Sequence, residues 1–108
     1  MKLAKNDERP MVEMGSGVGR RTMVWGDRML MAEIHIDPGG QVPRHDHEYE
    51  QIGYCFSGRF DLTVGDETQT IEPGMGWVIP GGVPHSATGV DATFLIEIWN
   101  PARDDYKD

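Results

Sequence analysis

The sequence predicts an all-β fold, a small antiparallel barrel or sandwich that forms a single domain. Short segments rich in β-prone residues are separated by turn signals at fairly regular spacing, which is typical of such folds. No stretch of about 11 or more residues shows helical periodicity. The chain of 108 residues offers room for one domain and contains no linker, so we expect one domain over residues 1–108. The turn signals lie at residues 37–40, 57–58, 65–66, 72–74 and 80–82.

The pattern of apolar residues predicts which strand faces are buried. In residues 59–64, apolar and polar side chains alternate, which indicates a strand with one buried face and one face in water. Residues 29–36 and 93–99 are apolar at nearly every position, which is typical of strands that are covered on both faces. In a barrel this small, the outer face of these strands must be covered by another layer. We expect that layer to be a second subunit, and therefore a homodimer. The alternative is that the N-terminal segment folds over the outer face.

The charge of the chain narrows its partners. The formal net charge of −8 argues against nucleic acid and anionic membranes, because both bind basic surfaces. The negative charge also repels an anionic substrate at long range, unless arginines near the binding site make the local electrostatic potential positive. We therefore expect no nucleic acid and no membrane as a partner.

The cellular compartment is indicated by three features of the sequence. No apolar run approaches the roughly 18–20 residues that span a bilayer, and residues 1–10 are too polar for a secretory signal. Cys55 is the only cysteine, which excludes an intramolecular disulfide and fits a reducing compartment. We expect a cytoplasmic protein in which Cys55 is a small buried apolar residue rather than a catalytic thiol.

The histidines are the first candidates for chemistry. His45 and His47 are two positions apart, so on a strand they share a face, with Cα atoms about 6.5–7 Å apart. Two such imidazoles can bind one ion at the bond lengths of about 2.0–2.1 Å that zinc sites show. A His-x-His pair alone is weak evidence for a metal site, and the spacing to His85 strengthens this evidence. His35 has no spaced partner, and we expect it in the core or on the surface.

Two spaced motifs surround these histidines. The first motif consists of Gly39, His45, His47, Gln51 and Gly58, and the gaps between them are five, one, three and six residues long. The second consists of Gly74, Pro80, Gly82 and His85, with gaps of five, one and two residues. This spacing resembles the two motifs of the cupin superfamily. The resemblance implies a single-domain cupin, a double-stranded β-helix (jelly-roll) barrel, and one divalent metal ion.

The implied metal ligands are His45, His47, Gln51 and His85, and two positions depart from the usual motif. Gln51 stands where cupins usually have glutamate, and glycine stands four residues past His85 where asparagine is usual. A neutral amide ligand leaves the ion its full charge, which makes it a stronger Lewis acid. The alternative is a slipped register with Glu50 as the ligand. Small residues two and four positions after Gln51, on its face of the strand, would leave room for a ligand.

The metal and its role stay open at this point. Three imidazoles and an amide oxygen suit Ni, Zn, Fe or Mn, so the ligand types do not select among them. This set leaves one or two coordination positions free, as a catalytic metal requires. A structural or residual metal is the alternative.

Three further segments narrow the resemblance. Residues 45–54, 79–87 and 97–106 resemble the KdgF family of pectin-degradation cupins, which have a His, His, Gln, His metal set. With the C-terminal segment, the resemblance runs from about Val18 to Tyr106. It implies ring opening of 4,5-unsaturated uronate monosaccharides, derived from pectin or alginate, to linear 4-deoxy-5-keto uronates. Gln51 would then contact substrate as well as metal.

The resemblance also implies roles for three C-terminal residues. Glu97 stands at the position of the family's catalytic aspartate and would be the acid or base, although its extra methylene moves the carboxyl group by roughly 1.5 Å. Trp99 would pack against the sugar ring, and Arg103 would pair with the substrate carboxylate. The alternatives are an exposed Glu97, a core Trp99 and an Arg103 in a salt bridge with a neighbouring aspartate. Arg20 and Arg21 are weaker candidates that would otherwise form a solvated edge.

Other functions remain open on sequence alone. A different metal-cupin enzyme, such as a dioxygenase, would need a redox metal and oxygen. A non-catalytic module that binds a sugar acid would keep its ligand after loss of the Glu97 carboxylate. A storage or assembly cupin is disfavoured, because it would have no use for an intact metal set.

Overall fold

A computed structural model describes all 108 residues, which form eight strands and two short 3-10 turns. Every strand pair is antiparallel, so the all-β antiparallel fold predicted from the sequence is confirmed. No helix in the structure is long and apolar enough to cross a membrane. In chain order the elements are η1 (Asn6–Glu8), β1 (Val12–Glu13), β2 (Val18–Trp25), β3 (Leu30–Ile36), β4 (Gln41–His45), β5 (Glu50–Val64), β6 (Glu67–Ile71), β7 (Gly76–Ile79), β8 (His85–Asn100) and η2 (Asp104–Tyr106).

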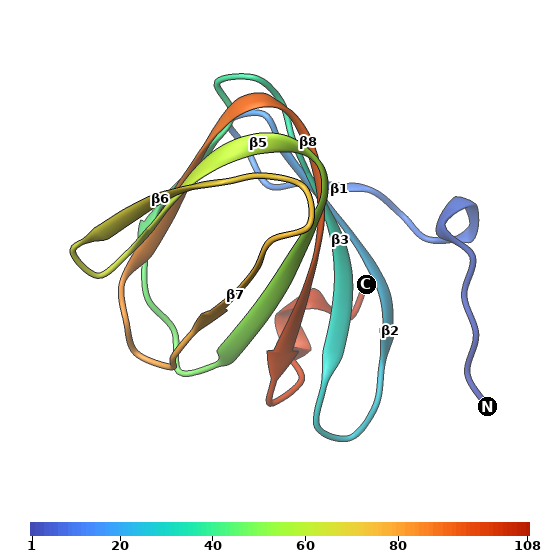
Figure 1. The fold of residues 1–108 in the computed structure, drawn as a ribbon. Helices are drawn as coiled ribbons and strands as arrows, with labels where there is room; N and C mark the ends of the chain where they lie inside the picture. The colour runs from blue at the N-terminus through green and yellow to red at the C-terminus, as the bar shows by residue number, and fades with distance from the viewer.

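The strands roll into two layers that share the two longest strands (Figure 1). β5 and β8 pair along their length, from Glu50 opposite Asn100 to Val64 opposite His85. In one layer, β3, β2 and β1 follow the C-terminal half of β8, and β7 pairs with the N-terminal half of β5. In the other layer, β4 pairs with the N-terminal half of β8, and β6 pairs with the C-terminal half of β5. The two layers enclose a cavity.

Glycine allows β5 to bend between the layers. The signal at residues 57–58 predicts a turn, but β5 continues without reversing, and its register with β8 shifts there. Gly58 has a φ of 89°, and a Cβ on it would overlap the Ala92 carbonyl oxygen. Only glycine fits such a bulge, so the expected turn is corrected to a bend within one strand. Gly89 likewise lies against the Asp37 carbonyl, which explains why no asparagine fits there.

The core lies inside the barrel, as the alternation predicts. In residues 59–64 the side chains of Phe60 and Leu62 are buried, whereas Arg59 is exposed and Asp61 is half-buried. The other four turn signals are confirmed, since the chain turns at residues 38–39, 65–66, 73–74 and 81–82. The buried apolar residues are Val18, Leu30, Ala32, Ile34, Ile36, Cys55, Phe60, Leu62, Ile71, Ile79, Ala87, Leu95 and Trp99.

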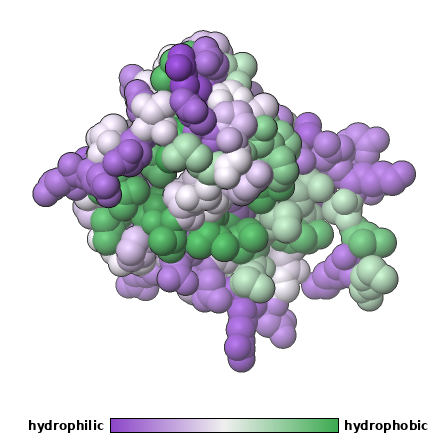
Figure 2. Space-filling model, in the orientation of Figure 1, coloured by the Kyte–Doolittle hydropathy of each residue, from purple (hydrophilic) through white to green (hydrophobic).

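The outer face of the barrel is not covered by this chain. Residues 2–4, 8 and 9 lie beside residues 23–25 of β2, where the Arg9 guanidinium stacks on Trp25, so the N-terminal segment does not cover β5 and β7. Figure 2 shows a band of apolar residues across this side of the molecule. The homodimer expected from the sequence therefore stays a prediction. The exposed apolar residues of β5, β7 and the turn between β6 and β7 include Ile52, Tyr54, Phe56, Met75 and Val78.

Candidate metal centre

Three histidines converge at one end of the barrel. His45 is the last residue of β4 and pairs with His85, the first residue of β8. His47 lies beyond the end of β4, so the loop, and not a shared strand face, brings it to the cluster. Ring centroids are 4.3 Å apart for His45 and His85, 4.7 Å for His47 and His85, and 5.4 Å for His45 and His47. The sequence prediction that these three residues meet is therefore correct in outcome, although the strand geometry differs.

Backbone carbonyls hold each imidazole ring in a set orientation. In all three histidines Nδ1 donates to a carbonyl oxygen two residues away. A carbonyl oxygen can only accept, so in the neutral ring Nε2 carries the free lone pair. Such a bond also fixes the ring, as is usual for histidines that bind metals. The bonds join His45 to Pro43 at 2.8 Å, His47 to Tyr49 at 3.0 Å and His85 to Val83 at 2.8 Å.

The ligand atoms of the cluster fit a divalent ion. Nε2 of His47 and Nε2 of His85 are buried without any hydrogen-bond partner. Burial is the main cause that lowers the pKa of both rings, so both are neutral, the form that binds metal. The ligand atoms of the three histidines all lie within 4.8 Å of one another. A first-row ion with bonds of about 2.0–2.1 Å holds its ligands about 3–4 Å apart, close to this spacing.

Gln51 reaches the same end of the cavity from β5. Its side chain is buried, with 5% of the residue exposed, whereas the alternative ligand Glu50 is exposed. The Gln51 oxygen accepts a hydrogen bond of 3.0 Å from the Trp99 indole, and the Gln51 nitrogen donates to a Glu97 oxygen. The amide also lies beside His47, where it opposes the lowering of that pKa. Gln51 thus lies where the cupin motif predicts a ligand.

Glu97 faces the cavity from β8. It is half-buried among cavity-lining residues, so it is not the exposed strand-end carboxylate of the alternative hypothesis. Burial raises the pKa of Glu97 to about 7, and the neighbouring N–H groups of Gln51 and Trp77 and the charge of Arg103 oppose this rise. A carboxyl group with this pKa exchanges protons near neutral pH, as a general acid or base must.

Trp99 and Arg103 also line the cavity, with Arg103 already paired. Trp99 is 3% exposed and belongs to the core as well as to the cavity wall. Arg103 bonds both oxygens of Asp105, at 3.2 and 2.8 Å, and stacks on the Tyr106 ring at 3.7 Å. Arg20 stacks on Tyr106 at 3.9 Å and is buried, so it is no solvated edge. The salt bridge considered for Arg103 is present in this structure.

Sequence reasoning missed the contact between Gly53 and Trp77. The small side chain at Gly53 was expected to leave room for a ligand, but a Cβ there would overlap the indole of Trp77. The space is therefore filled by Trp77, which lines the cavity beside the register pair Gly53 and Glu97. No spacing pattern in the sequence links residues of β7 to Gly53, so the contact could not be predicted from the sequence.

Two residues outside the site agree with their expected roles. Cys55 is fully buried, and burial raises the pKa of its thiol, which keeps it protonated and inert. His35 stacks on Phe94, with ring centroids 5.0 Å apart, and is not part of the histidine cluster.

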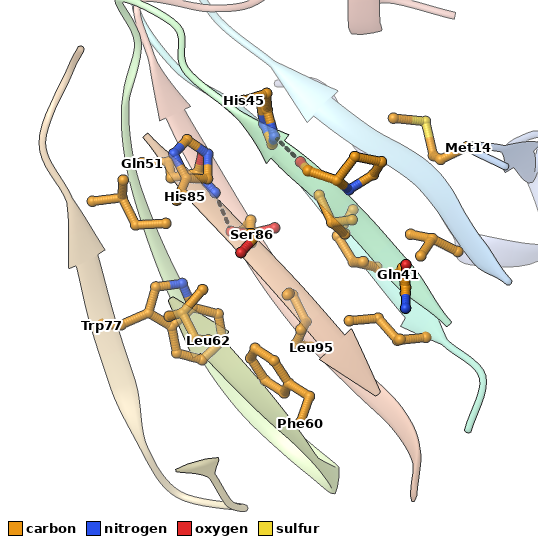
Figure 3. A pocket seen from close by; sticks show the side chains of 18 of the residues that line it. Met14, Gln41, His45, Gln51, Phe60, Leu62, Trp77, His85, Ser86 and Leu95 are labelled. Carbon is orange, nitrogen blue, oxygen red and sulfur yellow. Dashed lines mark hydrogen bonds between the residues drawn. The ribbon is translucent and has the colours of Figure 1, made fainter. Parts of the chain in front are cut away.

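The cavity that joins these groups has a volume of about 260 Å³. Figure 3 shows three of the four predicted ligands, His45, Gln51 and His85, grouped at one end and an apolar wall toward the other. Most of the lining residues are apolar, with a few polar groups at the histidine end. This combination is typical of a small-molecule site. The barrel thus holds a candidate metal centre with a carboxyl group beside it.

The fold and site define the class of protein. A family model described as "Cupin domain" matches residues 32–98, and the chain belongs to this family. Along most of its length it is similar to the pectin degradation protein KdgF of Dickeya dadantii (strain 3937), with 26% identity over 103 residues that cover 94% of each chain.

Solved structures agree with this assignment. An RmlC-like cupin from Shewanella frigidimarina NCIMB 400 superposes with a TM-score of 0.92 and 23% identity, over 98% of this chain and 96% of that one. The structure of KdgF from Halomonas sp. superposes with a TM-score of 0.91 and 25% identity, over 97% of each chain. The predicted cupin fold and the resemblance to KdgF are confirmed.

Proposed function

We propose that this cupin is a metal-dependent enzyme that opens the ring of 4,5-unsaturated uronate monosaccharides, derived from pectin or alginate, to give 4-deoxy-5-keto uronates. The observation that carries the proposal is the Glu97 carboxyl group in the cavity wall, which is bonded to Gln51 beside three convergent histidines. The similarity to the pectin degradation protein KdgF supports the substrate class. The net charge of −8 argues against nucleic acid and membrane as partners, and Arg103 in the cavity wall supplies the local positive charge that a sugar acid requires.

The metal would be held by His45, His47, Gln51 and His85. When bound there, a divalent ion such as Ni, Zn, Fe or Mn supplies positive charge that orients substrate oxygens and stabilises developing negative charge. The Nδ1–carbonyl bonds keep the three rings aimed, and the neutral state of the two buried rings needs no proton release. The chain's own residues supply the proton transfers.

Glu97 is the proposed acid and base. Ring opening removes the proton of the anomeric hydroxyl, breaks the bond between C1 and the ring oxygen, and adds a proton to C4. The 4,5-alkene becomes a ketone at C5 and C1 becomes an aldehyde, with no atom gained or lost overall. A carboxyl group with a pKa of about 7 can take the first proton and give the second.

Arg103 and Trp99 would bind the sugar. The Arg103 guanidinium, which now bonds Asp105 bidentately, offers the same geometry to the substrate carboxylate. Trp99 forms part of the cavity wall and can pack against the ring.

The direct test is loss of the conjugated-alkene absorbance of unsaturated galacturonate or mannuronate. We expect purified, metal-loaded protein to accelerate this loss, and to do so in anoxic buffer, which separates the reaction from that of an oxygen-dependent cupin. No acceleration over the spontaneous rate, with metal content confirmed, contradicts the proposed reaction and leaves the fold intact.

We also propose that the chain forms a homodimer through its uncovered outer face. The exposed side chains Ile52, Tyr54 and Phe56 lie on one face of β5 beside Val78 of β7, and they carry no charge that would repel a second copy. A contiguous apolar surface of this kind is typical of an interface. Light scattering should give twice the chain mass of 12.1 kDa, and a monomer mass at all concentrations contradicts the proposal.

A further inference from the structure

Trp99 makes a hydrogen bond that its roles as a core and sugar-packing residue do not require. The Trp99 indole nitrogen donates to the Gln51 side-chain oxygen at 3.0 Å, and both residues are buried. An indole N–H can only donate. The atom of Gln51 that faces Trp99 must therefore be the oxygen.

The other end of the same amide is also determined by its neighbour. The Gln51 nitrogen donates to the Glu97 carboxyl group. The ionised carboxylate can only accept, and the Trp99 N–H already fixes the oxygen at the other end, so the atom of Gln51 that faces Glu97 is the nitrogen. Rotating the amide by half a turn would set two donors against each other at Trp99 and two acceptors against each other at Glu97. Buried polar groups left unsatisfied in this way cost about 1–3 kcal/mol each.

We propose that Trp99 is a positioning residue, whose indole N–H holds the Gln51 amide in the one orientation that presents its oxygen to the metal and its nitrogen to Glu97. This inference rests on the proposed metal site. An amide oxygen has two lone pairs, so it can accept from Trp99 and still bind an ion. The same amide then links the metal to the carboxyl group that moves protons, and Trp99 sets the geometry of both through Gln51.

The variant Trp99→Phe tests this by removing the donor and keeping a large apolar ring. Groups that orient a metal ligand typically contribute about 10–100-fold to metal affinity, so we expect zinc to bind about 10–100-fold more weakly. Trp25→Phe is the matched control, because it makes the same substitution outside the cavity, where Trp25 lies under the Arg9 guanidinium. Its zinc affinity should stay within about threefold of wild type. Calorimetry or chelator competition measures both.

Repeating the Trp99→Phe substitution in a Gln51→Glu protein separates the effect of amide orientation from the effect of lost packing. The two ends of a glutamate side chain are equivalent, so Gln51→Glu needs no donor to choose between them. In that background the effect of Trp99→Phe on zinc affinity should fall below about threefold. Equal weakening in both backgrounds would mean that only packing was lost, and it overturns the proposal, as does wild-type affinity in Trp99→Phe.

The cobalt absorption spectrum gives a further reading if the Gln51→Glu background does not fold. The visible bands of bound Co²⁺ depend on its ligands, so the spectrum of Trp99→Phe should resemble that of Gln51→Ala. A spectrum identical to wild type overturns the inference. Failure of the wild type to bind metal overturns the metal site and this inference together. A failure of uronate ring opening with metal binding intact overturns the proposed reaction alone.

Discussion

The two faces of β5 and β8 are made by the same strands and have opposite properties. On the inner face, polar side chains have specific partners, as Gln51 has in Trp99 and Glu97. On the outer face, Ile52 and Tyr54 are exposed apolar residues that no part of the chain covers. The inner face therefore has the positioned polar groups that the proposed catalysis needs, and the outer face has an uncovered apolar surface that suits a second copy. Alternation along a strand separates the two roles by a single residue.

The largest expected effect is on the inner face, where Glu97→Gln removes the proton carrier. We expect turnover to fall by about 10²–10⁴-fold, the usual contribution of a positioned acid or base. Metal content should be unchanged, because Glu97 is not a proposed ligand. Steady-state kinetics on unsaturated uronate measures this, with metal analysis as the control. A variant that turns over at the wild-type rate would show that the inner carboxyl group has no catalytic part.

On the outer face, Tyr54→Lys should separate the dimer. A charge placed in an apolar interface stays unpaired when buried, so the variant should be a monomer with an intact fold. Thr70→Lys on the exposed strand β6 is the matched control and should stay dimeric. Light scattering and circular dichroism check mass and fold. If both variants stay dimeric, the contact between copies lies elsewhere on the molecule.

Glu97 also predicts a pH dependence of stability in the metal-free protein. Its pKa rises from 4.5 to about 7 on folding, so the folded state binds this proton more tightly than the unfolded state does. The stability that this proton contributes is full below about pH 4.5 and is lost as the pH rises toward 7. Glu97→Gln lacks this loss, so the variant should gain up to about 3 kcal/mol over wild type between pH 5 and pH 8. Urea unfolding with a chelator present measures the difference, and a constant difference contradicts the prediction.

The smallest effect expected is from Gly53→Ala. Its Cβ would overlap the Trp77 indole, and overpacking of this kind costs about 1–3 kcal/mol. Gly26→Ala is the matched control, because a Cβ at Gly26 meets no atom within 4 Å; it should change stability by less than about 0.5 kcal/mol. Equal stability of the two variants would show that Trp77 does not need the space above Gly53.

The sequence predicted those parts of the molecule that depend on local rules. Glycines and prolines marked four real turns, and motif spacing brought together His45, His47 and His85. The turn expected at Gly58 was wrong because a glycine also permits a bulge, and only the partner strand distinguishes the two.

The contacts that the sequence did not predict join residues far apart in the chain. The bond from Trp99 to Gln51 spans 48 positions, and the Trp77 ring fills the space above Gly53 from another strand. Such contacts depend on how β5, β7 and β8 are registered, which no spacing within one segment determines. The sequence therefore identified the residues that cluster at the candidate site and not the side-chain contacts around them.

The most direct test of the account is a zinc titration of the metal-free protein and its His85→Ala variant. The account predicts that the wild type binds one equivalent per chain and that the variant binds more than about 100-fold more weakly, because a direct ligand contributes more than a residue that only orients one. Binding that is equally tight in both, or no binding by the wild type, would contradict a metal centre inside this barrel.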